Sequence, residues 1–247
     1  MKKKSHITRR QAIAALSSAT GLLLTGCKTN DLPLTYGDIL RMGDLFTYVA
    51  QRKLLPGQIM AKEYGPEDIS SFPSTSISPA DAGYPKSYNE EYCRHAANNF
   101  KDWSVAVSGS VNKPQSFTLE KLRAYESRTQ VTRHQCEEGW SAIGGWTGVP
   151  LGVILQEVDI KPSARFVNFI AYDGFTGSID LYDAYHPQTL LAYGMNGSDL
   201  PEAHGAPLRA RVETQIGYKS VKYLQRIELV DDFPERENTG WSWFAGI

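Results

Sequence analysis

The sequence has few cysteines, no apolar run of membrane-spanning length and no Cys-x-x-Cys-His motif. A helix that crosses a bilayer needs about 20 apolar residues, so no segment of the mature chain is expected to cross a membrane. Without the Cys-x-x-Cys-His motif, the chain carries no covalent c-type heme. No internal repeat or low-complexity region occurs. The 247 residues, 41% of them hydrophobic, suffice for the core of one domain with an appendage.

The first 27 residues differ in composition from the rest of the chain. Three lysines and the pair Arg9-Arg10 precede an apolar run from Ala12 to Leu24, which is too short to span a membrane. This pattern predicts an export signal. The arginine pair is typical of a twin-arginine signal, and the sequence LTGC that ends at Cys27 is typical of a lipobox, whose cysteine is acylated. An ordinary basic leader remains the alternative for Arg9-Arg10.

Removal of residues 1–26 takes away five basic and no acidic side chains, so the net charge moves from −1 to −1 − 5 = −6. An acidic mature domain excludes nucleic acid as a partner. We expect an exported protein, in the periplasm or on the outer face of the cell membrane, with a lipid anchor at Cys27. A twin-arginine route carries folded proteins, which suits a chain that takes up a cofactor before export.

Composition divides the chain into an export signal (1–27), a tether and wrapping segment (28–92) and a catalytic domain (93–247). An amphipathic helix is expected between Lys28 and about Lys53. The stretch from Leu55 to Tyr92 is rich in Pro, Gly and Ser and predicts irregular chain wrapped over a core.

Alternating and apolar runs in the third segment predict a strand-rich α+β domain. Thr118 is expected to cap a short helix, and Pro150 to begin another. One strand, from Arg165 to Tyr172, reads as buried on both faces. Asn196-Gly197 predicts a hairpin turn. The expected strands cover Trp103–Gly109, Thr129–Gln135, Arg165–Tyr172, Leu190–Met195, Leu208–Glu213 and Ser220–Val230.

Cys136 lies between an alternating run and a glycine-rich turn with two tryptophans, in the stretch TRHQCEEGWSAIGGWTGVPL (132–151). A thiolate is a soft metal ligand or a nucleophile, and Arg133 and His134 make its surroundings basic. Most free cysteines are only small buried hydrophobes. In an oxidising compartment Cys136 could also pair with Cys93. The residues alone leave these alternatives open.

A second group of polar residues follows later in the chain. His204 precedes Arg209, and Arg209 and Arg211 are two apart on an expected strand, so they point to one face. The turn at 217–222 adds backbone N–H groups and two lysines, which suit an anion. A solvated sheet face is the alternative.

The two groups together resemble the sulfite oxidase family of molybdopterin enzymes, including its bacterial methionine sulfoxide reductase branch. The resemblance covers about Trp103 to Val230 and includes HPQTLLAYGMNG, LPEAHGAPLR and GYKSVKYLQRIEL. It implies a molybdopterin-binding domain in which Cys136 ligates molybdenum and Arg133 or His134 orients the substrate. It implies that the molybdopterin is bound by His204, Arg209, Lys219, Ser220, Val221 and Lys222.

The features in which this sequence differs from the family pattern lead to further predictions. Because the chain has no heme motif, electrons are expected to pass to or from a separate protein, such as a membrane cytochrome or a quinol-linked subunit. About seventeen residues follow Val230, so we expect no immunoglobulin-like dimerisation domain and a monomer. Trp241, Trp243 and Phe244 are expected to fold back as an aromatic clasp. Either Ser78–Tyr84 or Asn98–Asn99 is expected to contact the pterin.

The predicted activity is molybdenum-dependent transfer of an oxygen atom to or from a small substrate. Arg133 is the one clear cation next to Cys136, which favours reduction of an S- or N-oxide over oxidation of sulfite. A zinc-stabilised binding lipoprotein is one alternative, because Cys93, His95, His134 and Cys136 supply four ligands, although with tight spacing. A hydrolase in which Cys136 pairs with a histidine, His134 or His204, is another.

Overall fold

The computed structural model describes residues 59–74 and 86–232, and isolated positions between 42 and 54. The chain forms two compact units, Met1–Thr47 and Tyr48–Ile247. The described positions from 42 to 54 are helical, as predicted for this stretch. The predicted export signal and the C-terminal aromatic clasp lie outside the described residues. Among those described, no helix has the length and apolar character needed to cross a membrane.

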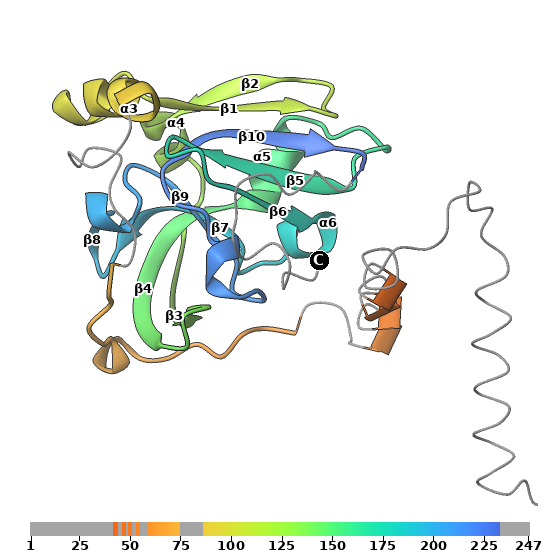
Figure 1. The fold of residues 1–247 in the computed structure, drawn as a ribbon, viewed down its shortest axis with the longest axis horizontal. Coiled ribbons are helices and arrows are strands. Elements are labelled where there is room, and N and C mark those ends of the chain that lie inside the picture. The colour runs from red at the N-terminus through yellow and green to blue at the C-terminus, as the bar shows by residue number, and fades with distance from the viewer. Residues whose placement is uncertain are drawn as a thin grey trace, which may run out of the picture. The chain divides into compact units, whose positions relative to one another are not determined.

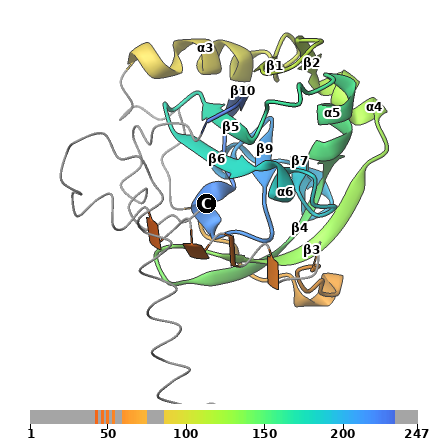
Figure 2. The same cartoon turned by 90° about the vertical axis from the view of Figure 1, so that its right-hand side faces the viewer.

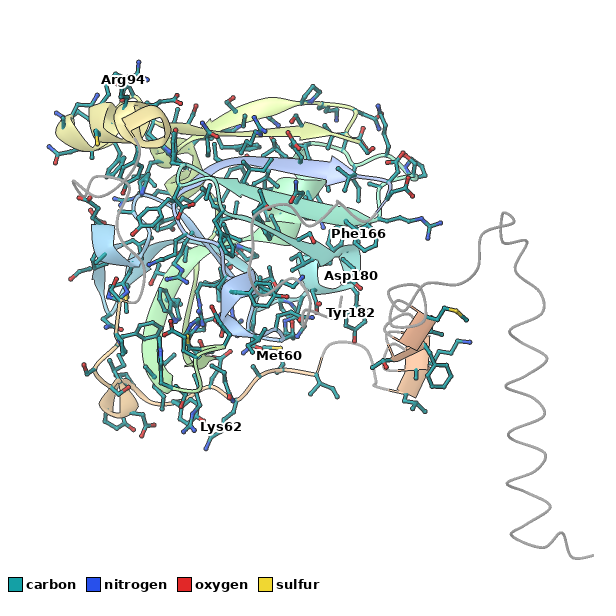
Figure 3. The ribbon with its side chains drawn as sticks, viewed as in Figure 1. Met60, Lys62, Arg94, Phe166, Asp180 and Tyr182 are labelled. Atoms are coloured by element: carbon teal, nitrogen blue, oxygen red, sulfur yellow. The ribbon has the colours of Figure 1, made fainter. Side chains whose placement is uncertain are left out.

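The second unit contains two five-stranded sheets, which Figure 1 shows as two layers. The first sheet has the order β2-β1-β10-β5-β6, and its pairs are antiparallel except for the parallel pair β1–β10. Its strands are β1 (Ser104–Gly109), β2 (Gln115–Thr118), β5 (Phe166–Ala171), β6 (Thr176–Asp180) and β10 (Leu224–Val230). Phe166 and Asp180, labelled in Figure 3, face each other in the β5–β6 register.

The second sheet is antiparallel throughout, with the order β3-β4-β7-β8 and β9 paired to β7. Its strands are β3 (Arg128–Gln135), β4 (Ser141–Pro150), β7 (Leu190–Met195), β8 (Ser198–Asp199) and β9 (Arg209–Arg211). Asn196 and Gly197 join β7 to β8 with φ of 51° and 79°. A tight hairpin turn requires positive φ at both positions, so the predicted Asn-Gly turn is confirmed.

Short helices connect the strands, and Figure 2 shows α3 beside β1 and β2. The helices are α3 (Lys86–Ala97), α4 (Leu119–Ala124), α5 (Leu151–Glu157) and α6 (Leu181–Ala184), with 3-10 turns η1 (Pro66–Asp68), η2 (Glu202–His204) and η3 (Gly217–Lys219). The Thr118 hydroxyl accepts from Lys121 N at 3.1 Å and caps α4. Pro150 precedes α5, as predicted.

Three local predictions differ from the structure. In β5, residues 167, 169 and 171 are buried and their neighbours only half-buried, so one face is less covered than the apolar sequence suggested. Residues 220–223 form a turn, and β10 begins at Leu224, because the Ser220 carbonyl is held by Arg209. Residues 86–92 belong to α3, since the Pro- and Gly-rich composition ends at Pro85.

The main apolar core is formed by residues of both sheets and of α3, α4 and α5, and includes the fully buried Trp103, Phe117 and Phe169. Full burial of such a side chain contributes about 1.5–3 kcal/mol. A smaller cluster on the second sheet consists of Trp146, Ala192, Met195 and Leu200. This smaller cluster supports the candidate site.

Residues 59–74, which we call the strap, run along the second sheet. Tyr64 N donates to Val131 O at 2.9 Å, and Ser70 N donates to Ile143 O at 3.0 Å. The buried Gln188 amide accepts from Ala61 N at 2.7 Å and donates to Ala61 O at 3.0 Å. Figure 3 shows Met60 and Lys62 of the strap far from Arg94 on α3. The strap ends against the candidate site.

Candidate active site

A cavity of about 140 Å³ joins the strap, the end of β3, the residues around β9 and the turn at 217–222. It brings together residues that are far apart in the sequence. The predicted residues that line it are His134, Cys136, His204, Arg209, Ser220, Val221 and Lys222.

Cys136 follows the last residue of β3, in a tight turn where its N–H donates to Trp140 O at 2.9 Å. Its side chain is 8% exposed and lines the cavity. Cys93 and Cys136 are not joined by a disulfide, so the disulfide alternative is excluded. Burial raises the pKa of the Cys136 thiol, and the carboxylates of Glu137 and Glu138 raise it further. A bound cation would reverse this, because metal ligation stabilises the thiolate.

Among the described residues, the sites that the hydrolase and the zinc-lipoprotein alternatives require are not formed. The hydrogen bond of the Cys136 thiol goes to Glu138 Oε2 at 3.9 Å and not to a histidine, so no nucleophile–base pair is formed. The described part of the chain contains no group of three or more His, Cys, Asp or Glu residues that could hold a metal. His95 lies on α3, 2.7 Å from Asp102 Oδ1. The zinc-site prediction is therefore wrong.

The β3 alternation separates the two residues predicted to orient the substrate. His134 is buried and lines the cavity, whereas Arg133 is exposed on the opposite face, with its guanidinium 5.5 Å from the Tyr64 ring. Burial lowers the pKa of His134 to about 2, and Arg211, Arg209 and Lys222 contribute to the shift. The imidazole is therefore neutral at physiological pH.

Positive charge gathers at one end of the cavity. Arg209 is 4% exposed and donates from its two terminal nitrogens to His204 O and Ser220 O, both at 2.9 Å. Burial and the neighbouring Arg211 lower its pKa to about 9. Lys222 donates to Ala203 O at 3.0 Å, and burial and Arg209 lower its pKa to about 8. Both side chains remain charged at neutral pH and suit an anion.

Burial also affects His204, whose pKa falls to about 4 with contributions from Arg209 and Lys222. His204 is thus a neutral polar group beside two cations. The Ser220 hydroxyl accepts from Val212 N at 3.2 Å, which holds the turn against the end of β9. Val221 forms an apolar part of the wall.

Some predicted residues do not reach the cavity. Lys219 is buried, but its ammonium donates to Ser178 O at 2.6 Å and the residue is not part of the lining. Asn98 and Asn99 are not part of it either, and Ser78–Tyr84 lies outside the described residues. Lys219 fixes the turn rather than facing the cavity.

The strap brings an aromatic residue that sequence reasoning missed. The Phe72 ring lies 5.2 Å from His134, 5.9 Å from Trp140, 5.4 Å from Trp146 and 5.5 Å from His204, between ring centroids. The Pro- and Gly-rich composition marks the strap as a long loop of the kind that is often functional. Phe72 belongs to no sequence motif that would distinguish it from other aromatic residues in loops.

Two acidic residues of the lining were also missed. Glu137 Oε2 is buried without a hydrogen-bond partner among the described residues. Asp173 accepts from Phe175 N at 2.9 Å, and burial raises the pKa of its carboxyl. An unpartnered buried oxygen is costly unless a ligand or water satisfies it. The cavity therefore has the polar chemistry of a binding site.

Comparison with known proteins identifies the class. Residues 94–238 match the oxidoreductase molybdopterin binding domain family. The chain is 34% identical over 246 residues to a candidate protein-methionine-sulfoxide reductase subunit, YedZ1, of Azospira oryzae, which covers 99% of this chain and 87% of that protein. It is 36% identical over 155 residues to the protein-methionine-sulfoxide reductase catalytic subunit MsrP of Xanthomonas campestris, covering 56% of this chain and 47% of the relative.

A solved structure, the sulfane dehydrogenase SoxCD from Paracoccus pantotrophus, shares the fold. Its TM-score is 0.51 at 24% identity, and the match covers 53% of this chain and 39% of that chain. The chain thus spans less than half the length of the SoxCD chain and of the MsrP relative.

Fold and family together define an oxidoreductase that works through a bound molybdenum–molybdopterin cofactor. The chain belongs to the oxidoreductase molybdopterin binding domain family.

The residues present fit this cofactor chemically. The cavity offers a soft sulfur from Cys136 and, beside it, the cations Arg209 and Lys222 for a phosphate. A Cβ added at Gly217 would lie 2.7 Å from His134 Nε2, so only glycine lets the turn approach this closely. At about 140 Å³ the cavity is smaller than common small-molecule sites of roughly 300–1,000 Å³.

Proposed function

We propose that the chain reduces S-oxides, methionine sulfoxide in particular, at a molybdenum centre ligated by Cys136. The observation that carries the proposal is the single cavity lined by a free Cys136 and by Arg209 and Lys222. The names of the Azospira and Xanthomonas relatives, both methionine sulfoxide reductase subunits, support the choice of substrate.

Each residue has a distinct part in this proposal. When bound, the cofactor supplies the two-electron chemistry of oxygen-atom transfer. Cys136 holds the metal through its sulfur, while Arg209 and Lys222 bind the anionic end of the pterin and His204 adds a neutral polar contact. Phe72 and Trp140 cover the cavity with aromatic rings and limit the entry of water. The balanced reaction is R₂SO + 2H⁺ + 2e⁻ → R₂S + H₂O.

The charges inside the cavity favour a neutral substrate over sulfite. Arg133, the cation expected beside Cys136, lies on the opposite face of β3. Arg209 and Lys222 are already engaged by backbone carbonyls and by the pterin phosphate that we assign to them. Little positive charge is left for a dianionic substrate, whereas a sulfoxide needs only a hydrogen-bond donor.

We also propose that electrons come from a separate membrane protein and that the chain works outside the cytoplasm, with a lipid anchor at Cys27. The twin-arginine and lipobox patterns of residues 1–27 support this location. The word subunit in the relatives' names supports a separate electron-transfer partner.

Metal analysis tests the proposal. Protein matured in a molybdate-replete host should contain about one molybdenum per chain and should reduce methionine sulfoxide with an artificial electron donor. Cys136→Ala should abolish turnover, whereas Cys93→Ala, which removes the other described cysteine, should retain it. Iodoacetamide should label Cys136 only after the cofactor is lost. A wild-type protein without molybdenum, or one that oxidises sulfite but leaves sulfoxides unchanged, would refute the proposal.

A further inference from the structure

A buried polar network lies behind His134. Arg211 is 1% exposed and its Nη1 is 2.8 Å from His134 Nδ1. Glu213 occupies the other nitrogens of the same guanidinium: its two oxygens accept from Arg211 Nε at 3.1 Å and from Nη2 at 2.8 Å. Gln130 Nε2 donates to Glu213 Oε1 at 3.0 Å. Arg211 is therefore held in one orientation, with one N–H aimed at the imidazole.

The network determines which imidazole nitrogen carries the hydrogen. A guanidinium has donors and no acceptor, so His134 Nδ1 must accept from Arg211. A neutral imidazole that accepts at Nδ1 carries its hydrogen on Nε2. The hydrogen bond thus selects one tautomer.

The opposite nitrogen lies against Gly217, another residue of the cavity lining. His134 lines the cavity with Cys136, and its Nε2 is close enough to Gly217 that an added Cβ would meet it at 2.7 Å. No described protein group bonds to Nε2. The rings of Phe72 and Trp140 lie 5.2 and 5.6 Å from the imidazole and restrict its rotation. Nε2–H is therefore a fixed donor on the wall of the cavity that Cys136 also lines.

We propose that Arg211 is a positioning residue that fixes His134 as a neutral hydrogen-bond donor, and that His134 Nε2–H binds the acceptor oxygen of an S-oxide substrate. This inference rests on the proposed function and adds a specific contact to it. Of the two residues expected to orient the substrate, Arg133 or His134, it assigns the contact with the substrate oxygen to His134.

Hydrogen bonds to Asp183 also fix the segment that follows Arg211. The buried Asp183 carboxylate accepts from Thr214 Oγ1 at 2.9 Å and from Gln215 Nε2 at 2.7 Å. Arg211 also lies over the Trp146 ring, with its guanidinium carbon 4.3 Å from the centroid. These contacts leave the guanidinium little freedom to release the imidazole.

Nitrogen-15 NMR of the histidine-labelled holoenzyme tests the first half of the proposal. The His134 ring should show an unprotonated Nδ1 and a protonated Nε2. Arg211→Met would leave Glu213 buried without its partner, so Arg211→Met is combined with Glu213→Gln. In this double variant we expect a mixture of tautomers. A protonated Nδ1 in the wild type, or the same single tautomer in a folded double variant, would overturn the role of Arg211.

Titration of the same sample with dimethyl sulfoxide tests the second half. The Nε2–H resonance should shift with dimethyl sulfoxide and stay in place with dimethyl sulfide, which lacks the acceptor oxygen. His134→Gln keeps an N–H donor near the Nε2 position and should retain the KM for sulfoxides within about threefold. His134→Leu removes the donor and should raise that KM roughly tenfold.

The outcomes separate this inference from the proposed function. If wild-type enzyme reduces sulfoxides and His134→Leu has an unchanged KM, the substrate contact is refuted and the proposed function stands. If wild-type enzyme contains molybdenum but does not reduce or bind sulfoxides, the proposed function and the substrate contact both fall. The tautomer measurement then still decides the Arg211–His134 arrangement.

Discussion

Buried cations and neutral imidazoles share the cavity, and the cations change the ionisation of their neighbours. Burial lowers the pKa values of His134, His204 and Lys222, and the charge of Arg209 adds to each shift. Without a ligand these positive charges repel one another in a region of low dielectric. A bound anion removes that repulsion, so the residues are arranged for a partner that carries negative charge.

Lys222 should make cofactor retention depend on pH. Its pKa is lowered to about 8, so the ammonium is present below that pH and is lost as pH rises through it. We expect cofactor retention to fall between about pH 7 and about pH 9.5. The free energy of unfolding of the apoprotein should change in the opposite direction. Because the pKa of Lys222 is lower in the folded state than in the unfolded chain, this free energy is greatest above the unfolded pKa and decreases as pH falls towards 8.

Molybdenum content after dialysis across this range measures the effect. Lys222→Arg keeps its charge and should flatten the profile, whereas Lys222→Met should retain less cofactor at every pH. Equal retention by wild type and Lys222→Met would show that this ammonium does not bind the anion.

At the scale of elements, the strap is the part of the described chain on which access to the cavity depends. It is joined to β3 by one backbone hydrogen bond, to β4 by one backbone bond and one from Ile143 N to the Ser70 hydroxyl, and to Gln188 by three. Phe72, near its end, touches four rings around the site. A segment with few backbone bonds opens more easily than a sheet interior. The strap is therefore the element expected to move when the cofactor enters.

Gln188→Leu should loosen the strap. The substitution leaves the N–H and carbonyl of Ala61 without their partner, and a lost buried hydrogen bond costs about 1–3 kcal/mol. Amide hydrogen exchange in residues 59–74 should become roughly 10–100-fold faster, while β5 and β10 keep their protection. Gln225→Leu, which removes a surface bond of 3.3 Å to Glu91, serves as the control. Unchanged exchange in the strap would mean that its other contacts suffice.

At the scale of the whole molecule, the second unit places its site at the ends of strands from both sheets. Cys136 follows β3, Arg209 begins β9 of the same sheet, and Lys222 precedes β10 of the other. The parallel pairing of β10 with β1 is non-local and joins the β1–β2 pair to β5 and β6 in the first sheet. Cofactor binding should therefore join the two sheets, which agrees with insertion before export.

Residues 1–27 should couple folding to transport. Replacing Arg9 and Arg10 with lysine should keep the protein in the cytoplasm with its molybdenum in place, because the folded state forms before transport. Cys27→Ala should instead allow export and release the protein from the membrane fraction. Cell fractionation with metal analysis measures both. Normal export of the double lysine variant would show that a general secretory route is used.

Local patterns predicted most strands and the capped helix, because alternation, a Thr cap and an Asn-Gly turn act over a few residues. The α3 helix was missed, since a polar helix after a Pro-rich stretch has little apolar periodicity to mark it. Arg133 and His134 could not be distinguished in sequence, because the direction of β3 alternation depends on which face the sheet buries. Phe72 and Glu213 were missed as parts of the site, and the contact of Arg211 with His134 was not predicted, because the partners of these residues are far away in the chain.

The sequence by itself determined the class of cofactor and the residue types around it, since Cys136 and the stretch from His204 to Lys222 stand in short motifs. Only the tertiary structure decided that Arg133 lies outside the cavity, that His134 points in, and that Arg211 and Glu213 stand behind it. The physical reason is that hydrogen bonds and burial depend on distances between groups, and the pairing of strands from distant segments sets those distances.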